Sequence, residues 1–357
     1  MDRRWRAVAG CTLIGAIFLF VQVGALALVE PFKSAGYQAV EDPSDPTNSI
    51  VYVGAILVAT AGMLLAFKYD ADQLIRALIV FSSAWLSLYI FRLVAPPVFV
   101  GGFNVVALGM ATLLGVALLV YPEWYVIDTA GAVMGAAAAG LFGISFGILP
   151  ALLLLTVLAV YDAISVYGTE HMLTLASGVM DLRVPVVLVI PLSLSYSFLD
   201  ATTPDPTADE ESDEATEEGG TTDEPPAEDT AARPETSEET APPADEESPD
   251  DEGDQGPLER DALFIGLGDA IIPAILVASA AFFAPAGVRT VVGVPLPAVT
   301  AMVGTFLGLA VLLWMVLKGR AHAGLPLLNG GSIAGYLLGA VVAGIGLVDA
   351  LGLGPYV

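Results

Sequence analysis

The sequence predicts an all-α polytopic membrane protein with nine transmembrane helices. Hydrophobic residues make up 55% of the 357 residues and charged residues only 15%, and the mean hydropathy is +0.74. The apolar residues gather into runs of roughly 20 residues, the length that an α-helix needs to cross a bilayer. Only helices and closed barrels satisfy their backbone in lipid, and such long apolar runs exclude a barrel.

Nine apolar stretches are separated by charged or turn-forming residues. We expect spans at residues 7–29, 49–67, 74–92, 98–120, 127–146, 147–167, 262–284, 293–317 and 327–350. The fifth and sixth spans follow one another directly, and only Gly143, Gly147 and Pro150 mark the break between them.

The first span follows Arg3, Arg4 and Arg6, so it could be mistaken for a signal peptide. Its apolar run is longer than the ~7–15 residues of a signal-peptide core, and Glu30 follows without a clear small-x-small cleavage site. We therefore expect a retained helix and a cytoplasmic N-terminus.

Nine spans then place the C-terminus outside the cell. Of the 13 basic residues, ten fall on the predicted cytoplasmic side and three outside, which satisfies the positive-inside rule. The cytoplasmic ones are Arg3, Arg4, Arg6, Lys68, Arg76, Arg183, Arg233, Arg260, Lys318 and Arg320, and the outer ones are Lys33, Arg92 and Arg289.

Most of the net charge of −26 lies in residues 201–257, which hold 22 acidic residues and one arginine. This segment has almost no aliphatic residues, so we expect a disordered cytoplasmic linker, more simply a solvated spacer than a partner-binding segment. It divides the chain into a six-span part, 1–200, and a three-span part, 258–357. Because strong screening tolerates such self-repulsion, we expect a source with a high-salt cytoplasm, a halophilic archaeon.

Two aspartates lie inside apolar spans: Asp162 in LLLLTVLAVYDAISVYG and Asp269 in ALFIGLGDAIIPAILVASAAFF. A carboxylate in hydrocarbon costs at least ~2.5 kcal/mol, so each is a functional candidate and the obvious partner of the other. Each lies eight residues from a flanking charge, Glu170 or Asp261. If both segments are helical, both carboxylates lie about 12 Å from the cytoplasmic boundary, at one level.

The other acidic, cysteine and histidine residues form no catalytic or metal-binding pattern. Asp128 and Asp349 lie at span ends, where we expect them to be solvated. Cys11 is the only cysteine, and His171 and His322 show no metal-ligand spacing. No phosphate-binding or dinucleotide-binding glycine pattern is found. We therefore expect no metal, no cofactor and no nucleic-acid partner.

The residues around the two aspartates form short motifs. Tyr161 precedes Asp162, and Gly266-Leu267-Gly268 precede Asp269. Glycines here remove side-chain bulk, so that another backbone can come close. A third segment, Ala323-Gly324-Leu325-Pro326, leads into the last span, with Pro326-Leu327-Leu328 as a second possible register.

These motifs resemble those of the presenilin and signal peptide peptidase family of intramembrane aspartyl proteases. The family carries Tyr-Asp in its sixth span, Gly-x-Gly-Asp in its seventh and Pro-Ala-Leu at the start of its ninth, and the resemblance covers essentially all nine spans. In its longer form, Pro-Ala-Leu-Pro, the third motif aligns with Ala323-Gly324-Leu325-Pro326, of which only Leu325 and Pro326 match.

The resemblance implies a presenilin-like fold and cleavage of peptide bonds within single-pass transmembrane segments or remnant signal peptides. Asp162 and Asp269 would be catalytic, Tyr161, Gly266, Leu267 and Gly268 would support them, and Gly324, Leu325, Pro326 and Leu327 would contact substrate. Substrate identity and accessory subunits stay open. The β-branched run 184–190 is expected to form an edge strand for an extended substrate or, more simply, a partly buried connector.

Two alternatives belong to other classes of membrane protein. In a proton-coupled transporter, facing carboxylates relay protons, but transporters commonly show internal repeats and further buried charge, and neither is seen here. A prepilin-type peptidase also uses Gly-x-Gly-Asp, but its smaller span count and different placement of the first aspartate fit poorly.

Overall fold

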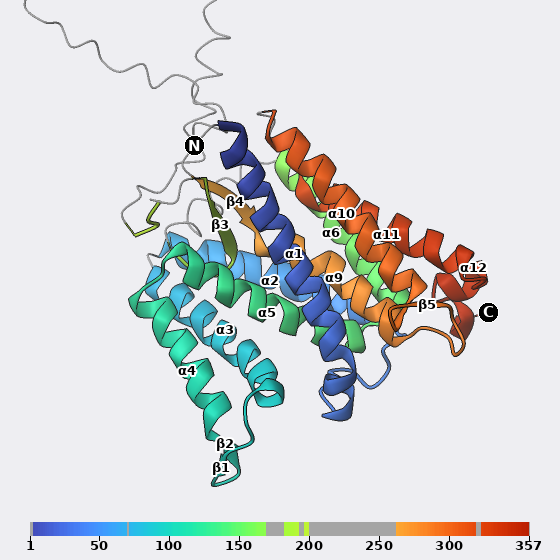
Figure 1. Ribbon diagram of the computed structural model, residues 1–357, viewed down its shortest axis with the longest axis horizontal. Helices are drawn as coiled ribbons and strands as arrows, with labels where there is room; N and C mark the ends of the chain where they lie inside the picture. Colours follow the sequence, from blue (N-terminus) through green and yellow to red (C-terminus); the bar gives the residue numbers. More distant parts are fainter. Residues whose placement is uncertain are drawn as a thin grey trace, which may run out of the picture.

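The computed structural model describes residues 3–69, 71–168, 182–192, 196–199, 262–318 and 323–356. Nine helices of 16 or more residues dominate this part of the chain (Figure 1). They are α1 (Arg3–Ser34), α2 (Thr47–Lys68), α3 (Asp72–Val94), α4 (Val105–Val120), α5 (Trp124–Ser145), α6 (Ile148–Gly168), α9 (Leu267–Phe282), α10 (Leu296–Val316) and α11 (Gly324–Val342). The short α12 (Leu347–Ala350) and a 3₁₀ turn (Gly354–Tyr356) follow.

Seven of these helices are long and apolar enough to cross a membrane, while α4 and α9 are apolar but shorter. A helical, polytopic membrane protein is thereby confirmed, and the count of nine spans stays a prediction. The all-α class is wrong in one respect, because three two-stranded antiparallel sheets interrupt the helices. They are β1 with β2 (Phe99–Val100, Phe103–Asn104), β3 with β4 (Val187–Pro191, Ala262–Gly266) and β5 with β6 (Thr290–Val291, Val294–Pro295).

Two of these sheets are tight hairpins that delay the start of the fourth and eighth predicted spans. Gly101 and Gly102 form the first turn with φ of 61° and 86°, and Val292 and Gly293 form the second with φ of 52° and 81°. Two successive residues with positive φ are what a type I′ hairpin turn requires. Asn104 then caps α4 by accepting two backbone N–H groups of its first turn.

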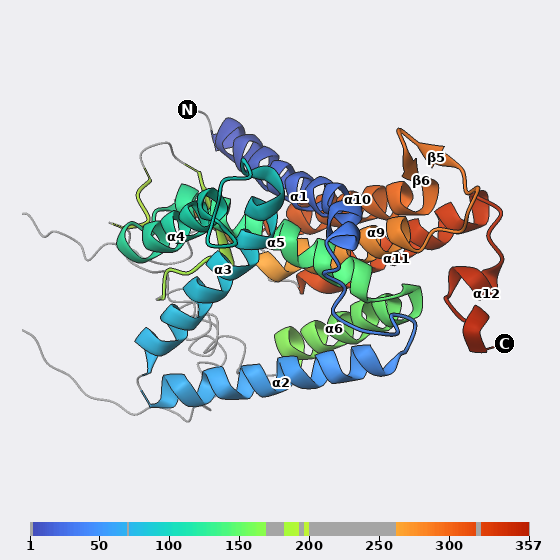
Figure 2. The same cartoon turned by 90° about the horizontal axis from the view of Figure 1, so that it is seen from below.

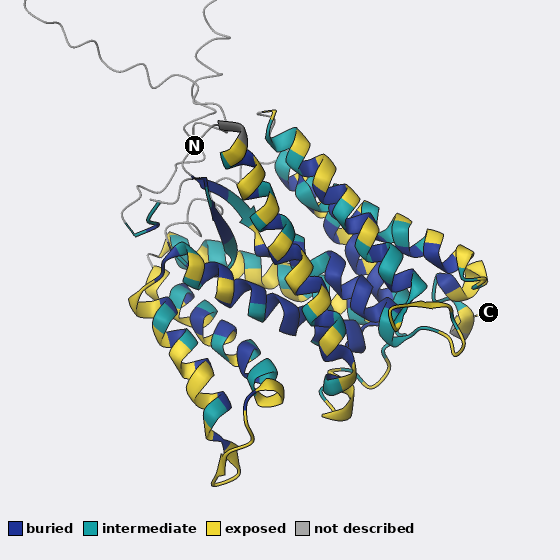
Figure 3. Ribbon diagram, in the orientation of Figure 1, coloured by how far each residue is buried: buried dark blue, intermediate teal, exposed yellow. Residues whose placement is uncertain are grey.

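The helices α5 and α9 form the centre of the bundle and are the most deeply buried, with α1, α6, α10 and α11 packed around α9 (Figure 3). The close packing depends on small residues, as is usual between membrane helices. A Cβ on Gly24 of α1 would lie only 2.8 Å from the Cβ of Ala136 of α5. Gly143 of α5 packs in the same way against Ala278 of α9.

Glycines also join α10 to α11. A Cβ on Gly304 would clash with the carbonyl group of Gly331, and one on Gly308 would clash with that of Leu327. The two backbones therefore touch, which fixes where α11 begins relative to the rest of the bundle.

The helix α2 lies at the edge of the molecule, alongside α6 (Figure 2). None of its most apolar stretch is buried in the protein, and Ile50, Val51 and Val58 are 64–73% exposed. Apolar surface of this kind suits contact with lipid. The Ser49 hydroxyl donates to the carbonyl of Pro150 at 2.6 Å and attaches α2 to α6.

The predicted break between the fifth and sixth spans is present, because α5 ends at Ser145 and α6 begins at Ile148. The Gly147 N–H donates to the carbonyl of Pro43 at 2.7 Å. A Cβ on Gly147 would lie 2.9 Å from that same oxygen. This turn therefore needs glycine.

The predicted seventh span, 262–284, does not begin as a helix. Its first residues form β4, which pairs with β3 so that Val187 faces Gly266 and Pro191 faces Ala262, and α9 begins only at Leu267. Apolar side chains pack on both faces of this sheet. A short strand buried on both faces is a continuous apolar run, and such a run cannot be told from a helix by periodicity.

Candidate active site

Asp162 lies on α6, in the half of the helix that ends at Gly168. The residue is only 9% exposed. Its carboxylate oxygen Oδ2 accepts a hydrogen bond from the backbone N–H of Leu325 at 3.0 Å. This bond joins two helices whose residues are 163 positions apart in the chain.

Asp269 lies in the first turn of α9, directly after β4. A Cβ on Gly324 would lie 3.0 Å from the Oδ2 of Asp269 and 3.4 Å from its Cγ. Asp269 is also close enough to Asp162 to interact with its charge. The carboxylates of Asp162 and Asp269 therefore approach neighbouring residues, Gly324 and Leu325, from two different helices.

The residue count that placed Asp269 about 12 Å from the boundary assumed a helix, and this assumption is wrong because residues 262–266 are a strand. A strand rises about 3.3 Å per residue and a helix only 1.5 Å, so counting residues along a helix does not apply there. Glu170 and Asp261, the charges from which the depth was counted, lie outside the described residues. Packing of α6, α9 and α11 brings the aspartates together instead.

The first turn of α11 suits two carboxylates. The first four N–H groups of a helix have no partner within it, and the N-terminal end of the helix dipole is positive. The N–H of Leu325 is one of these groups. Pro326, the third residue of α11, is tolerated because a first-turn nitrogen needs no intrahelical bond.

The remaining predicted site residues differ in their surroundings. Leu267 is buried and its N–H donates to the carbonyl of Val186 at 2.8 Å, extending the β3–β4 ladder. Gly266 and Gly268 are exposed, and a Cβ on Gly268 would meet only the Ile272 side chain, at 3.8 Å.

Pro326 and Leu327, which were expected to contact substrate, and Tyr161, which precedes Asp162, are less buried than Asp162. Leu327 is partly buried, and its carbonyl packs against Gly308 of α10. Pro326 is partly buried beside it. The side chain of Tyr161 is 40% exposed, so it does not share the burial of Asp162.

The segment expected between residues 184 and 190 is a strand at Val187–Pro191, paired with β4 rather than standing alone. Leu188, Val189 and Ile190 are buried. This agrees with the expectation of a buried connector, and an edge-strand role of this run toward substrate stays a prediction.

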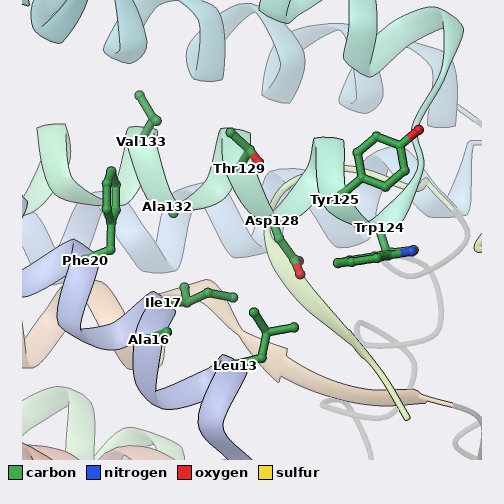
Figure 4. Close-up of a pocket in the computed structure, with 10 residues that line it drawn as sticks. All are labelled: Leu13, Ala16, Ile17, Phe20, Trp124, Tyr125, Asp128, Thr129, Ala132 and Val133. Carbon is green, nitrogen blue, oxygen red and sulfur yellow. The ribbon is translucent and has the colours of Figure 1, made fainter. Parts of the chain in front are cut away.

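Asp128 was expected to be solvated at the end of a span, and this is wrong. The residue is 6% exposed, and its Oδ1 accepts the N–H of Val189 at 2.8 Å. In Figure 4 its side chain points from α5 toward the β3–β4 sheet, beside a groove of about 300 Å³ between α1 and α5. Asp349 is exposed, as expected.

Two further buried polar residues were not singled out from the sequence. Asn329 of α11 donates from Nδ2 to the carbonyl of Leu155 of α6 at 2.9 Å, one helical turn after Leu325. Glu123 accepts from the Ser197 hydroxyl at 2.7 Å and from the Phe198 N–H at 3.0 Å. A polar residue within an apolar helix was the signal that could have found Asn329.

No group of three or more histidine, cysteine or acidic side chains is gathered as a metal site within the described part of the chain. His171, His322 and the acidic segment 201–257 lie outside it. Two carboxylates beside backbone N–H donors can share a proton and act on a water molecule without a metal.

Comparisons with known proteins bear on this geometry. A family model described as "Signal-peptide peptidase, presenilin aspartyl protease" matches residues 15–345. The comparison with curated proteins finds no match.

The chain is also similar to two solved structures. One is described as "Structure of a presenilin family intramembrane aspartate protease in C222 space group"; the identity is 31%, the TM-score 0.58, and the match covers 93% of this chain and 99% of that chain. The other, the same description in the P2 space group, has 30% identity and a TM-score of 0.54, and covers 92% and 96%.

Proposed function

The chain belongs to the signal-peptide peptidase and presenilin family of aspartyl proteases, and from that premise we propose that Asp162 and Asp269 are its catalytic pair. The family match extends over residues 15–345 and so includes both aspartates. The protein is an intramembrane aspartic endopeptidase that acts on transmembrane substrates.

The proposal rests above all on the shared contact of both carboxylates with the first turn of α11. Asp162 accepts the N–H of Leu325, and Asp269 lies so close to Gly324 that a Cβ there would be 3.0 Å from its Oδ2. Both come from apolar helices, where an acid without a function is expensive.

The chemistry follows from the proximity of two acids. Two carboxylates ~3 Å apart do not both ionise, so the pair holds one proton between them. One carboxylate takes a proton from a water molecule, which attacks the scissile carbonyl carbon, and the other gives its proton toward the carbonyl oxygen. The pair titrates as a unit, and neither aspartate has a permanent role. No metal or organic cofactor takes part.

An extended substrate peptide has a place to pair beside Asp269. Phe264 of β4 faces away from β3 with its backbone N–H and C=O, because alternate residues of an antiparallel strand bond to opposite sides. No described residue bonds to these two groups. A substrate strand added there would run toward Asp269, with Gly324, Leu325, Pro326 and Leu327 as its further contacts.

The finer organisation is part of the same proposal. Nine spans, a cytoplasmic N-terminus and an extracellular C-terminus would put the pair on the cytoplasmic half of the membrane. Residues 201–257 would link the six-span part, 1–200, to the three-span part, 258–357. The substrates would be single-pass segments or remnant signal peptides. A high-salt cytoplasm in an archaeal source would account for the acidic linker.

The test uses purified full-length protein in bilayer vesicles and a panel of single-span peptides. We expect cleavage within the apolar segment, mapped by mass spectrometry. A peptide that carries a hydroxyl group in place of the scissile carbonyl, and so mimics the tetrahedral transition state, should inhibit it. Proton-driven solute flux with no cleavage of any peptide would contradict the proposal.

A further inference from the structure

We infer that Asp128 is a positioning residue that holds β3 and, through the β3–β4 sheet, the backbone that carries Asp269. The inference rests on the proposed catalytic role of Asp269. Asp128 itself lies on α5 and contacts neither Asp269 nor the first turn of α11 by any hydrogen bond within the described residues.

A buried acid at this place needs an explanation. Asp128 is 6% exposed and stands beside the apolar side chains Leu13, Ile17 and Trp124 (Figure 4). Placing a carboxylate in such surroundings costs free energy. Its one hydrogen bond to a described residue is the one that Oδ1 accepts from the Val189 N–H, at 2.8 Å.

That N–H belongs to the outer edge of β3. Val186 accepts from Leu267 across the ladder, so the even-numbered residues of β3 bond toward β4. Val189, an odd-numbered residue, therefore points its N–H away from β4. Asp128 satisfies this outer edge, whereas the outer edge of β4 at Phe264 has no partner among the described residues.

Two more side chains hold the same segment. Arg6 of α1 donates from Nε to the carbonyl of Leu192 at 2.8 Å. Glu123, the residue before α5, accepts from Ser197 and Phe198. Asp128 and these two residues attach β3 and the described residues after it to α1 and to the start of α5.

The β3–β4 sheet connects the position of β3 to the start of α9, the helix that carries Asp269. Val187 lies opposite Gly266, and the Leu267 N–H donates to Val186, only two residues before Asp269. A shift of β3 along or away from α5 therefore moves the start of α9. It also moves the β4 edge, which is proposed to hold the substrate. Misplacement of reacting groups by about 1 Å can cost ~100-fold in rate.

The test compares three full-length variants, Asp128→Val, Asp128→Asn and Thr129→Val, on one single-span peptide that the wild type cleaves. Asp128→Val removes the acceptor at similar size and should lower kcat by about 10-fold or more while KM stays within about three-fold. Cleavage should also spread to neighbouring peptide bonds. Asp128→Asn keeps an oxygen for the Val189 N–H and should retain most of kcat and the single cleavage position. Thr129→Val changes an exposed neighbour on the same helix and should match the wild type.

If Asp128→Val does not fold, Val189→Pro tests the same bond from the strand. Proline removes an N–H that faces away from the ladder, a position where strands tolerate it, and it should reproduce the loss of kcat and the spread of cleavage. Wild-type kcat and a single cleavage position in folded Asp128→Val or Val189→Pro would overturn the inference, as would equal loss in Asp128→Asn and Asp128→Val. Failure of the wild type to cleave any peptide would instead overturn the proposed function.

Discussion

Asp162 and Asp269 approach two adjacent residues, Leu325 and Gly324 respectively, although they come from helices separated by a long stretch of chain. The Asp162 contact is a hydrogen bond to a helix N-terminus, and the Asp269 contact is a close approach to a glycine. Each contact depends on the start of α11 being in place. We therefore expect the site to be sensitive to bulk added at Gly324.

Gly324→Ala should reduce the cleavage rate by about 10-fold, because its Cβ would press on the carboxylate of Asp269. That Cβ would lie 3.0 Å from Oδ2, which is tighter than ordinary van der Waals contact. Gly109→Ala is the matched control, since Gly109 lies in α4 with no atom within 4 Å of an added Cβ. Steady-state cleavage of a single-span peptide measures both, and equal rates for both variants would contradict the contact.

Gly268→Leu should lose most of the cleavage activity for a different reason. Gly268 is exposed beside Asp269, and an added Cβ meets only Ile272 at 3.8 Å. The added Cβ therefore makes only an ordinary contact within the protein, whereas a leucine side chain at this exposed position would obstruct a substrate backbone approaching Asp269. Thr222→Leu in the acidic linker is the control. A folded Gly268→Leu protein with wild-type cleavage would show that substrate does not pass this residue.

At the residue scale, the sequence predicts the two catalytic candidates because an acid in an apolar span is conspicuous. The sequence does not predict the role of Asp128, because a residue near the end of a predicted span is expected to be solvated. Burial of Asp128 comes from a strand 61 positions away in the chain. Contacts at that separation leave no periodic signal in the sequence.

The individual elements follow hydropathy closely where helices are long. The helices α2, α3, α5, α6 and α10 begin and end within a few residues of the predicted spans, and the break at Gly147 is where glycine and proline indicate it. The exceptions are β4, the two hairpins and the last predicted span, 327–350, because α11 already ends at Val342 and a separate short helix, α12, follows. The apolar sequence of Ala262–Gly266 is compatible with a helix or with a buried strand. Its pairing with β3 is what makes it a strand.

The contact between α11 and α6 provides a prediction at the scale of elements. Asn329→Leu removes the hydrogen bond to the Leu155 carbonyl at nearly constant size. We expect a loss of about 0.5–2 kcal/mol in the free energy of unfolding, the range for such bonds within membrane bundles. The cleavage rate should fall as well, because the Asp162–Leu325 bond lies one turn away.

Thermal unfolding in detergent and cleavage by the same preparation measure both effects. Asn329→Gln is a poor replacement in so closed a site, so Leu338→Ala on the exposed face of α11 is the better control. Unchanged stability and rate in Asn329→Leu would show that this bond does not hold the two helices.

The whole molecule is a membrane bundle whose centre, α5 with α9, is buried and whose outer helix α2 faces outward. The family match decides for a protease over the proton-coupled transporter that facing carboxylates alone would also permit. Most of the negative charge lies in residues 201–257, outside the bundle's apolar spans.

Deleting most of residues 201–257 while keeping a flexible join should leave cleavage within about three-fold of the wild type, because this segment has no large apolar residues and cannot form a core. The same peptide assay measures the effect at matched amounts of folded protein. A folded deletion variant without activity would show that the linker takes part in the reaction or in substrate capture.

Whether Asp162 and Asp269 act as one catalytic pair is tested most directly by cleavage with Asp162→Asn and Asp269→Asn. Each change keeps the size of the side chain and removes one member of the proton-sharing pair. We expect both variants to fold, with thermal unfolding near that of the wild type, and neither to cleave a peptide that the wild type cuts. Asp349→Asn, at an exposed position, should cleave normally. Cleavage at the wild-type rate by either folded Asp162→Asn or Asp269→Asn would contradict the pair.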